Sequence, residues 1–255
     1  MKKFVFLSIT FLSAFLILYC SNINEESNNG MNVYRQIKES DIPWITWAKS
    51  VEDRDIYLLE LGNGDSTTLI FGGFHGSEIP GVQLVHRFAD YLYNEYKDSL
   101  KSRVIIVPVV NPDGLVKAKR QNANAVDINR NFPTENWSKE YKSRKNFPGY
   151  SPASEPETKA VMVLLEKYRP QRIISVHTPL NMVNYDGPAL DLANKMAQFN
   201  KYPVQANIGY PTPGSFGTYA GIERKIPTIT LELPRHSFKK IWEKNREALL
   251  TTLNF

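Results

Sequence analysis

The sequence predicts one α/β domain, built on a mixed, largely parallel central sheet that is flanked by helices on both faces. Strand-like and helix-like segments alternate from residue 34 to the end, which is typical of folds with a parallel sheet. Several strand candidates are almost continuously apolar, as strands buried on both faces are. The 255 residues, 42% of them hydrophobic and 22% charged, suit a single soluble domain.

The first half of this domain is expected to contain two strands and a helix. Asp55–Leu61 ends in Gly-Asn-Gly, a hairpin-type turn, and Thr67–Phe71 is rich in β-branched and aromatic residues. After the second strand, apolar residues recur in steps of three and four, which predicts a helix with one apolar face. The residues of this face are Val82, Val85, Ala89, Leu92, Tyr93 and Tyr96.

The rest of the domain is expected to contain three more strands and two helices. Arg103–Val110, Arg172–Val176 and Ile226–Leu233 are short and mostly apolar, so we expect them to be buried strands. Glu155–Tyr168 has apolar residues at helical spacing and stops before a proline. A last helix is expected from Ser237 onward. In such folds ligands bind at the carboxyl ends of the strands.

Residues 1–33 are expected to be a signal or lipoprotein-like leader with a polar linker, which leaves residues 34–255 as the folded domain. Two lysines precede Phe4–Tyr19, an uncharged run that resembles a secretory signal and is short for a bilayer span of about 20 residues. A polar stretch that resembles a tether follows. We therefore expect an exported protein, in the periplasm or the cell envelope.

Cys20, the only cysteine of the chain, stands at the end of the apolar run. This position resembles the acylation site of a bacterial lipoprotein, so we expect membrane attachment through a lipid on Cys20. An uncleaved anchor or a plain signal peptide is the alternative, because Tyr19 stands where a small residue is expected. With no cysteine after residue 20, the domain is expected to be stable without internal disulfides.

The charge pattern speaks against a nucleic-acid partner. The net charge is +5, and the basic residues are scattered, with no stripe interleaved with aromatic residues. One local cluster, Lys139, Lys142, Arg144 and Lys145, is expected to be a solvated loop.

Two histidines follow strand candidates, where an α/β sheet places its ligands. His75 comes after Thr67–Phe71, and Glu78 stands three residues later at the start of the expected helix, so both side chains can converge on one point. His177 follows Arg172–Val176. Two imidazoles and one carboxylate leave an open position for water, which is the ligand pattern of a catalytic zinc site with one Zn²⁺.

A hydrolase that uses zinc also needs a base. Glu232 is the candidate, because it shares one face of Ile226–Leu233 with Thr228 and Thr230. A carboxylate within a buried strand is costly unless it is paired or functional, and a structural pair with an arginine is the alternative. Arg120 and Arg130 are suited to holding a carboxylate or an oxyanion.

These motifs, taken together and in this order, resemble the zinc carboxypeptidases. The motifs are Gly-Gly-Phe-His-Gly-Ser-Glu, Asn-Pro-Asp-Gly, Asp-Ile-Asn-Arg-Asn-Phe, Ser-Glu-Pro-Glu-Thr, Ser-Val-His and Thr-Leu-Glu-Leu, over roughly residues 45–240. The resemblance implies that residues 34–255 are a zinc peptidase catalytic domain with His75, Glu78 and His177 as ligands. It implies Glu232 as the general base of a promoted-water hydrolysis. Asn129 and Arg130 would hold a terminal carboxylate of the substrate, and Arg120 would polarise the scissile carbonyl.

Two further segments resemble the murein peptide amidases, a branch of that family which cuts the γ-D-glutamyl–diaminopimelate bond of cell-wall peptides. They are Asn-Tyr-Asp-Gly-Pro-Ala from Asn184 and Gly-Tyr-Pro-Thr-Pro-Gly-Ser-Phe-Gly from Gly209. The resemblance implies that Tyr210 closes over the substrate, which would be a peptide or a peptidoglycan stem peptide. Asp186 would bind the amino group of diaminopimelate.

Three other functions stay open at this point. One is a conventional metallocarboxypeptidase that acts on ordinary peptides. Another is an aspartoacylase-type deacylase of N-acyl amino acids, which shares a His-Gly-x-Glu start. The third is a cell-wall binding lipoprotein without catalysis, against which the intact Glu232 and the full ligand set argue.

Overall fold

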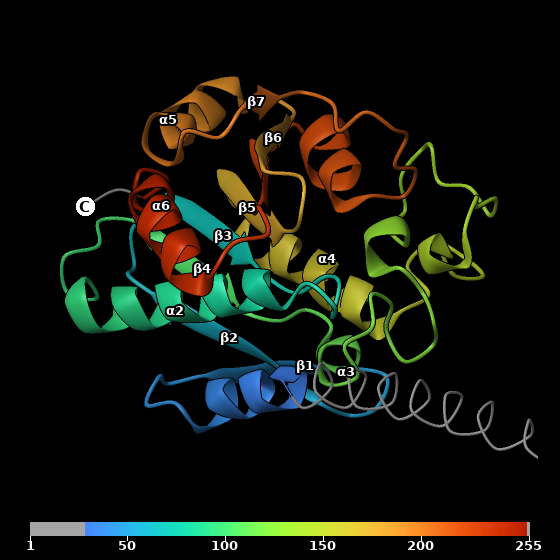
Figure 1. The fold of residues 1–255 in the computed structure, drawn as a ribbon, viewed down its shortest axis with the longest axis horizontal. Helices are drawn as coiled ribbons and strands as arrows, with labels where there is room; N and C mark the ends of the chain where they lie inside the picture. Colours follow the sequence, from blue (N-terminus) through green and yellow to red (C-terminus); the bar gives the residue numbers. More distant parts are fainter. Residues whose placement is uncertain (1–28, 254–255) are drawn as a thin grey trace, which may run out of the picture.

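The computed structural model describes residues 29–253 (Figure 1). The expected leader, including Cys20, lies outside these residues except for its last five positions, 29–33. Within the described residues no helix is both long and apolar enough to span a bilayer.

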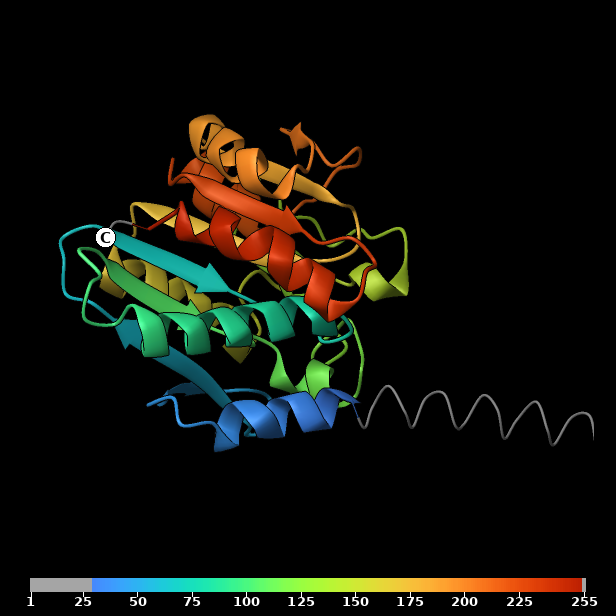
Figure 2. The same ribbon diagram turned by 60° about the vertical axis from the view of Figure 1, so that its left-hand side comes forward.

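A single mixed sheet of eight strands runs through residues 29–253, in the order β1-β2-β4-β3-β5-β8-β6-β7 (Figures 1 and 2). Its centre, β4, β3, β5 and β8, is parallel, while β2 and β6 run antiparallel on either side of that centre. The strands are β1 (Ile45–Lys49), β2 (Asp55–Leu61), β3 (Thr67–Phe71), β4 (Arg103–Val107), β5 (Arg172–His177), β6 (Met182–Asp186), β7 (Val204–Gln205) and β8 (Thr228–Glu232).

Helices cover both faces of the sheet, as the sequence predicts. One face carries α2 (Ile79–Glu95), α5 (Leu190–Asn200) and α6 (Phe238–Leu250), and the other carries α4 (Pro156–Tyr168) and the π-helical η3 (Thr218–Glu223).

Successive side chains along each strand point to opposite faces of the sheet, which divides the core into these two layers. In β4, Ile106 packs with the layer of α2, α5 and α6, while its neighbour Ile105 packs with the layer of α4. Ile174 and Ile173 divide in the same way in β5. The strands read as apolar runs in the sequence because both of their faces are buried.

Residues 29–39 form a helix that packs against the fold. Val33 and Ile37 are buried in a cluster with Tyr57, Val82 and Leu115. The structured part of the chain therefore includes residues 29–33, which the sequence assigns to the linker.

Two predicted boundaries differ from the structure for identifiable reasons. The strand expected over Arg103–Val110 ends at Val107, because Pro108 has no N–H to donate to a ladder. The helix expected from Glu155 begins at Pro156, with Glu155 as its N-cap and the proline in the first turn, where its missing N–H costs nothing.

Candidate metal centre and substrate pocket

Three neighbouring segments bring the predicted metal ligands to the carboxyl edge of the sheet. His75 lies in the loop after β3, Glu78 is the N-cap of α2, and His177 is the last residue of β5, which pairs directly with β3. The loop is tightly packed: a Cβ on Gly76 would lie 1.9 Å from the backbone carbon of Gly114, so only glycine fits there.

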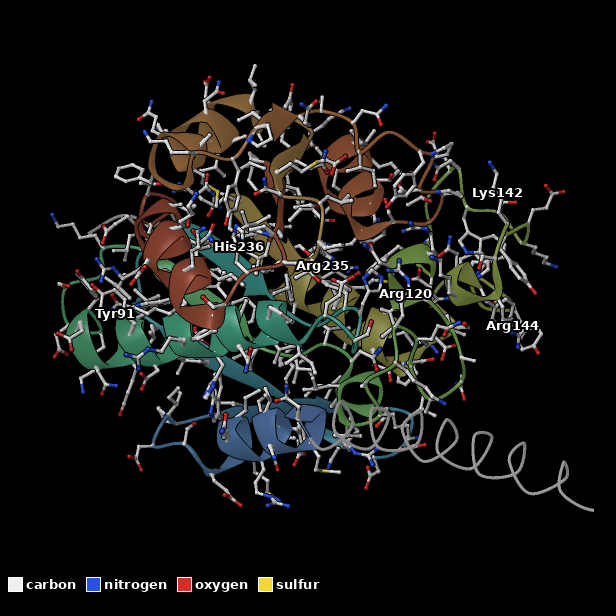
Figure 3. The ribbon with its side chains drawn as sticks, viewed as in Figure 1. Tyr91, Arg120, Lys142, Arg144, Arg235 and His236 are labelled. Atoms are coloured by element: carbon white, nitrogen blue, oxygen red, sulfur yellow. The ribbon has the colours of Figure 1, made fainter. Side chains whose placement is uncertain are left out.

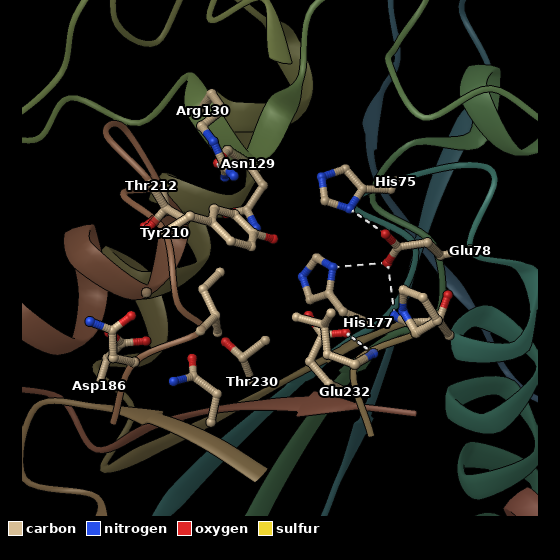
Figure 4. A pocket seen from close by; sticks show the side chains of 18 of the residues that line it. His75, Glu78, Asn129, Arg130, His177, Asp186, Tyr210, Thr212, Thr230 and Glu232 are labelled. Carbon is tan, nitrogen blue, oxygen red and sulfur yellow. Dashed lines mark hydrogen bonds and ion pairs between the residues drawn. The ribbon is translucent and has the colours of Figure 1, made fainter. Parts of the chain in front are cut away.

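The ligand atoms converge on one point (Figure 4). His75 Nδ1 lies 2.8 Å from Glu78 Oε1, and His177 Nδ1 lies 3.0 Å from Glu78 Oε2. One ligand atom from each residue lies within 4.8 Å of the others, and the two imidazoles are buried while the Glu78 side chain is 11% exposed. Phe74 stacks on the His177 ring with the ring centres 5.8 Å apart, which fixes that imidazole in place.

Asp127 orients His75 from behind, a role that the sequence does not predict. Its Oδ1 lies 2.9 Å from His75 Nε2, so this nitrogen carries the ring proton and donates a hydrogen bond to the carboxylate. His75 Nδ1 then presents its lone pair toward the ligand cluster, where Arg120 Nη1 lies 3.3 Å away. A carboxylate behind a ligating histidine is a common support of zinc sites.

Arg120, the arginine that the family resemblance assigns to the scissile carbonyl, lies beside the ligand cluster. Its Nε and Nη2 donate to Asp127 Oδ2 at 3.0 and 2.8 Å, and its Nη1 lies 3.6 Å from Glu78 Oε1. The two bonds to one carboxylate fix the plane of the guanidinium. Figure 3 shows Arg120 on the loop that follows α3 (Pro112–Val116).

Glu232 ends β8 next to His177, with which it pairs in the parallel register. It lies in the same pocket as the ligand cluster, and the backbone N–H of Leu180 donates to its Oε2 at 3.3 Å. No arginine or lysine of the described residues lies within ion-pair distance of Glu232, so the alternative of a structural ion pair does not apply here.

The carboxylates of this site have different electrostatic surroundings. Burial alone would raise the pKa of Glu78, but His75 and His177 hold it well below its usual range. Burial would also raise the pKa of Asp127, which His75 and Arg120 hold low. Burial raises the pKa of Glu232, and the nearby charge of Glu78 adds to the rise while His177 opposes it.

The residues present fit one zinc ion. Imidazole nitrogens and a carboxylate are ligands that zinc prefers, and three protein ligands leave the open position of a catalytic site. The ionised Glu78 and the lone pair left on His75 Nδ1 are the forms that bind a metal. The cluster also opens into a cavity of about 410 Å³, rather than being closed off by a fourth protein ligand.

Asn129 and Arg130 line this cavity, as the motif Asp-Ile-Asn-Arg predicts. The Asn129 side-chain oxygen accepts the N–H of Phe216 at 2.8 Å, which fixes the amide. Arg130 is buried, and no carboxylate in residues 29–253 lies within 4.0 Å of it. Burial lowers the pKa of its guanidinium. A buried cation without an ionic partner is costly, so the site favours an anionic ligand.

Tyr210 stands between two cavities. It lines the pocket of the ligand cluster and also a second cleft of about 530 Å³, and Arg130 borders both. The ring is 52% exposed and lies in the pocket on the side of Asn129 and Arg130 (Figure 4).

Asp186 lies at the end of the pocket away from the histidines (Figure 4). It is the last residue of β6, and Asn184, two residues earlier on the same face of that strand, lines the same pocket. Asn184 stands opposite Thr230 of β8, which also lines the pocket. A Cβ on Gly217 would lie 2.3 Å from Asp186 Oδ2, so the glycine makes room for the carboxylate. Burial raises the pKa of Asp186 to about 6. No cation in residues 29–253 pairs with it.

Comparison with known proteins places this geometry in a family. A family model described as zinc carboxypeptidase matches residues 35–188. The chain belongs to the zinc carboxypeptidase family. The family uses zinc, with which the cluster of His75, Glu78 and His177 is compatible, and the chain is a hydrolase.

Relatives within the zinc carboxypeptidase family include two murein peptide amidases. The chain is 36% identical to murein peptide amidase A of Vibrio campbellii over 210 residues, which cover 78% of this chain and 82% of that protein. It is 32% identical to murein peptide amidase A of Escherichia coli K12, over 73% of this chain and 79% of that one.

Solved structures confirm the fold class. The murein-tripeptide amidase of Escherichia coli O157 has a TM-score of 0.73 at 29% identity, over 87% of this chain and 96% of that one. Bovine thrombin-activatable fibrinolysis inhibitor, at 21% identity, shares the fold with a TM-score of 0.67.

Proposed function

We propose that this zinc carboxypeptidase relative hydrolyses the γ-D-glutamyl–meso-diaminopimelate amide bond of peptidoglycan peptides, next to a free carboxylate. The observation that carries the proposal is a pair of uncompensated opposite charges in the pocket of the ligand cluster, Arg130 and Asp186. Diaminopimelate has a carboxylate next to the scissile bond, which matches Arg130, and an ammonium group beside a second carboxylate at the far end of its side chain, of which the ammonium group matches Asp186. The similarity to murein peptide amidases supports the same substrate.

His75, Glu78 and His177 would hold the zinc ion. Zinc in such a site lowers the pKa of water and polarises a carbonyl. Asp127 keeps His75 in the tautomer that the site needs, through its contact with Nε2.

Glu232 is the proposed base. Its raised pKa suits a group that must first take and then give up a proton. It takes a proton from the attacking water while the C–O bond forms, and passes this proton to the amide nitrogen as the C–N bond breaks. The products are a carboxylic acid and an amine. Arg120 stabilises the negative charge that develops on the carbonyl oxygen.

Arg130 and Asn129 set the register of the substrate. The buried guanidinium binds the free carboxylate, and the fixed Asn129 amide donates a second hydrogen bond. Asp186 binds the ammonium group at the other end of the diaminopimelate side chain. Tyr210 covers the substrate from the side of the second cleft.

The test uses the purified full-length chain with two substrates, L-Ala-γ-D-Glu-meso-diaminopimelate and a conventional peptide that ends in an apolar residue. We expect diaminopimelate to be released, and the release to stop when a chelator removes zinc and to return when zinc is added. Cleavage of the conventional peptide alone would contradict the proposed substrate. Release that a chelator leaves unchanged would contradict the use of zinc.

A conventional carboxypeptidase for basic C-terminal residues is a second candidate. Asp186 favours it, because a buried carboxylate can also pair with lysine or arginine. A peptide that ends in lysine, added as a third substrate, separates the two candidates. The match to the zinc carboxypeptidase family supports either of them over the N-acyl amino acid deacylase.

We further propose that the protein is exported and attached through a lipid on Cys20. The support is the leader pattern, the basic start and the apolar run that ends at this cysteine. In cells fed a labelled fatty acid, the unaltered chain should carry the label in the membrane fraction, and Cys20→Ala should not. An unlabelled protein in the soluble fraction would contradict the proposal.

A further inference from the structure

Lys145 belongs to a cluster that the sequence assigns to a solvated loop, yet it borders the pocket of the ligand cluster. It lies in η2 (Arg144–Asn146), a single turn of 3-10 helix. The neighbouring Lys142 lines the second cleft instead, together with Glu140. Figure 3 shows Lys142 and Arg144 on this outer segment of the molecule.

The backbone at Lys145 is held beside the segment that carries Arg120. Gln121 Nε2 donates to the carbonyl oxygen of Arg144 at 2.7 Å, and the N–H of Asp127 donates to the carbonyl oxygen of Phe147 at 2.8 Å. Phe147 is buried, and the Arg144 guanidinium lies over its ring at 4.7 Å. Lys145 therefore borders the pocket from a fixed turn whose backbone is held by the segment that follows Arg120.

Lys145 forms no ion pair within the described residues. No carboxylate in residues 29–253 lies within 4.0 Å of its ammonium group. Arg120, by contrast, is already bound to Asp127. The pocket thus has two cations free for a substrate, Arg130 and Lys145. The carboxylate of diaminopimelate next to the scissile bond occupies Arg130 in the proposed complex, and its second carboxylate lies beside the distal ammonium group that Asp186 binds.

A γ-linked glutamyl residue supplies an anion on the other side of the scissile bond. Its amide is made through the side-chain carbonyl, so its α-carboxylate stays free three carbons from the scissile carbonyl. In an ordinary peptide this carboxylate is consumed in the peptide bond. In the proposed reaction Arg120 lies at the scissile carbonyl, and Lys145 comes from the turn that is hydrogen-bonded to Gln121, the residue next to Arg120.

We propose that Lys145 is a specificity-determining residue that binds the free α-carboxylate of the γ-linked glutamyl residue. The proposal rests on the function proposed above and adds how the enzyme distinguishes a γ-linkage from an ordinary peptide bond. A partly solvated ion pair of this kind changes affinity by about two- to fivefold.

The experiment compares two substrates that differ only at the carboxylate in question. One is L-Ala-γ-D-Glu-meso-diaminopimelate, and the other carries the α-carboxamide in place of the α-carboxylate of the glutamyl residue. The proteins are the full-length zinc-loaded enzyme and its Lys145→Met, Lys145→Arg and Lys142→Met variants. Lys142→Met is the matched control, because Lys142 is a neighbouring exposed lysine that lines the other cleft.

We expect Lys145→Met to raise KM for the carboxylate substrate about two- to fivefold at unchanged kcat, and to leave KM for the amidated substrate unchanged. Lys145→Arg should keep KM close to that of the unaltered enzyme, and Lys142→Met should change KM for neither substrate. Calorimetric binding of the carboxylate substrate to Glu232→Gln, with and without Lys145→Met, should show the same difference in Kd.

An equal loss on both substrates, or no loss on either, would overturn the role of Lys145 and leave the proposed function standing. If the unaltered enzyme cleaves neither γ-linked substrate but does cleave ordinary peptides, the proposed function fails and the inference fails with it.

Discussion

Asp127 shows how much a single buried carboxylate does in this site. It touches His75 and Arg120 at once, so one side chain sets the tautomer of a ligand and the plane of an arginine. In the sequence it begins the motif Asp-Ile-Asn-Arg, in which only Asn129 and Arg130 are predicted to bind substrate. Its own role is invisible there, because it depends on His75, which lies 52 residues earlier in the chain.

Asp127→Asn should weaken zinc binding about ten- to a hundredfold, because the amide supports the His75 tautomer less well than a carboxylate does. The zinc dissociation constant is measured by competition with a chromophoric chelator. Asp98→Asn, an exposed residue far from the site in sequence, serves as the control and should leave zinc binding unchanged. An unchanged dissociation constant in Asp127→Asn would show that the contact does not support the metal.

Asp186→Asn should reduce kcat/KM for the diaminopimelate peptide about ten- to a hundredfold, because a buried charge-assisted hydrogen bond is lost. The matched substrate ends in 2-aminopimelate, which lacks the distal amino group, and it should lose less than about threefold. Equal losses on the two substrates would contradict an ammonium partner for Asp186.

The same residue gives the binding step a pH dependence. Burial raises the pKa of Asp186 to about 6, so its carboxylate is ionised above that pH and neutral below it. KM for the diaminopimelate peptide should therefore rise as the pH falls below about 6, and this rise should be absent in Asp186→Asn. A rise of equal size in the variant would assign the effect to another group.

At the scale of elements, the sequence predicts the strands that both helical layers cover. It misses β1, β6 and β7, which lie toward the two sides of the sheet. β3, β4, β5 and β8 are buried on both faces and alternate or run apolar along their length, which leaves a clear pattern. β6 has only two buried residues in five, and its polar side chains face the pocket. The sequence therefore names Asp186 only through resemblance, and it gives Asn184 no role at all.

α4 carries a second titrating group, Glu157, which is buried in its first turn. Burial raises the pKa of this carboxyl to about 7 from its ordinary 4.5, and the nearby Asp113 adds to the rise. The N–H of Val51 and the amide of Asn122 donate to its two oxygens at 3.2 and 3.0 Å and partly offset the burial.

Glu157 should make the protein less stable at high pH. Because the folded state binds this proton more tightly than the unfolded state, the contribution is complete below about pH 4.5 and is lost as the pH rises through about 7. The free energy of unfolding is measured in urea for the unaltered chain and for Glu157→Gln. The difference, unaltered chain minus variant, should fall by about 2–3 kcal/mol between pH 4.5 and pH 8. A difference that stays constant with pH would contradict a raised pKa.

For the whole molecule, the site exists only where three adjacent strands end together. His75 follows β3, His177 ends β5 and Glu232 ends β8, and these strands are neighbours in the sheet. The sequence predicts this edge, because the carboxyl ends of parallel strands meet on one side. What it cannot predict are contacts between loops, such as the one that brings η2 and Lys145 to the pocket.

The most direct measurement of the central claim combines zinc content and turnover in Glu232→Gln. The variant should bind one zinc ion per chain, as the unaltered enzyme does, because Glu232 is not among the ligands. Its rate of diaminopimelate release from L-Ala-γ-D-Glu-meso-diaminopimelate should fall by about 10²–10⁴-fold, the usual contribution of a general base. A zinc-loaded variant that releases diaminopimelate within about tenfold of the unaltered rate would contradict Glu232 as the base.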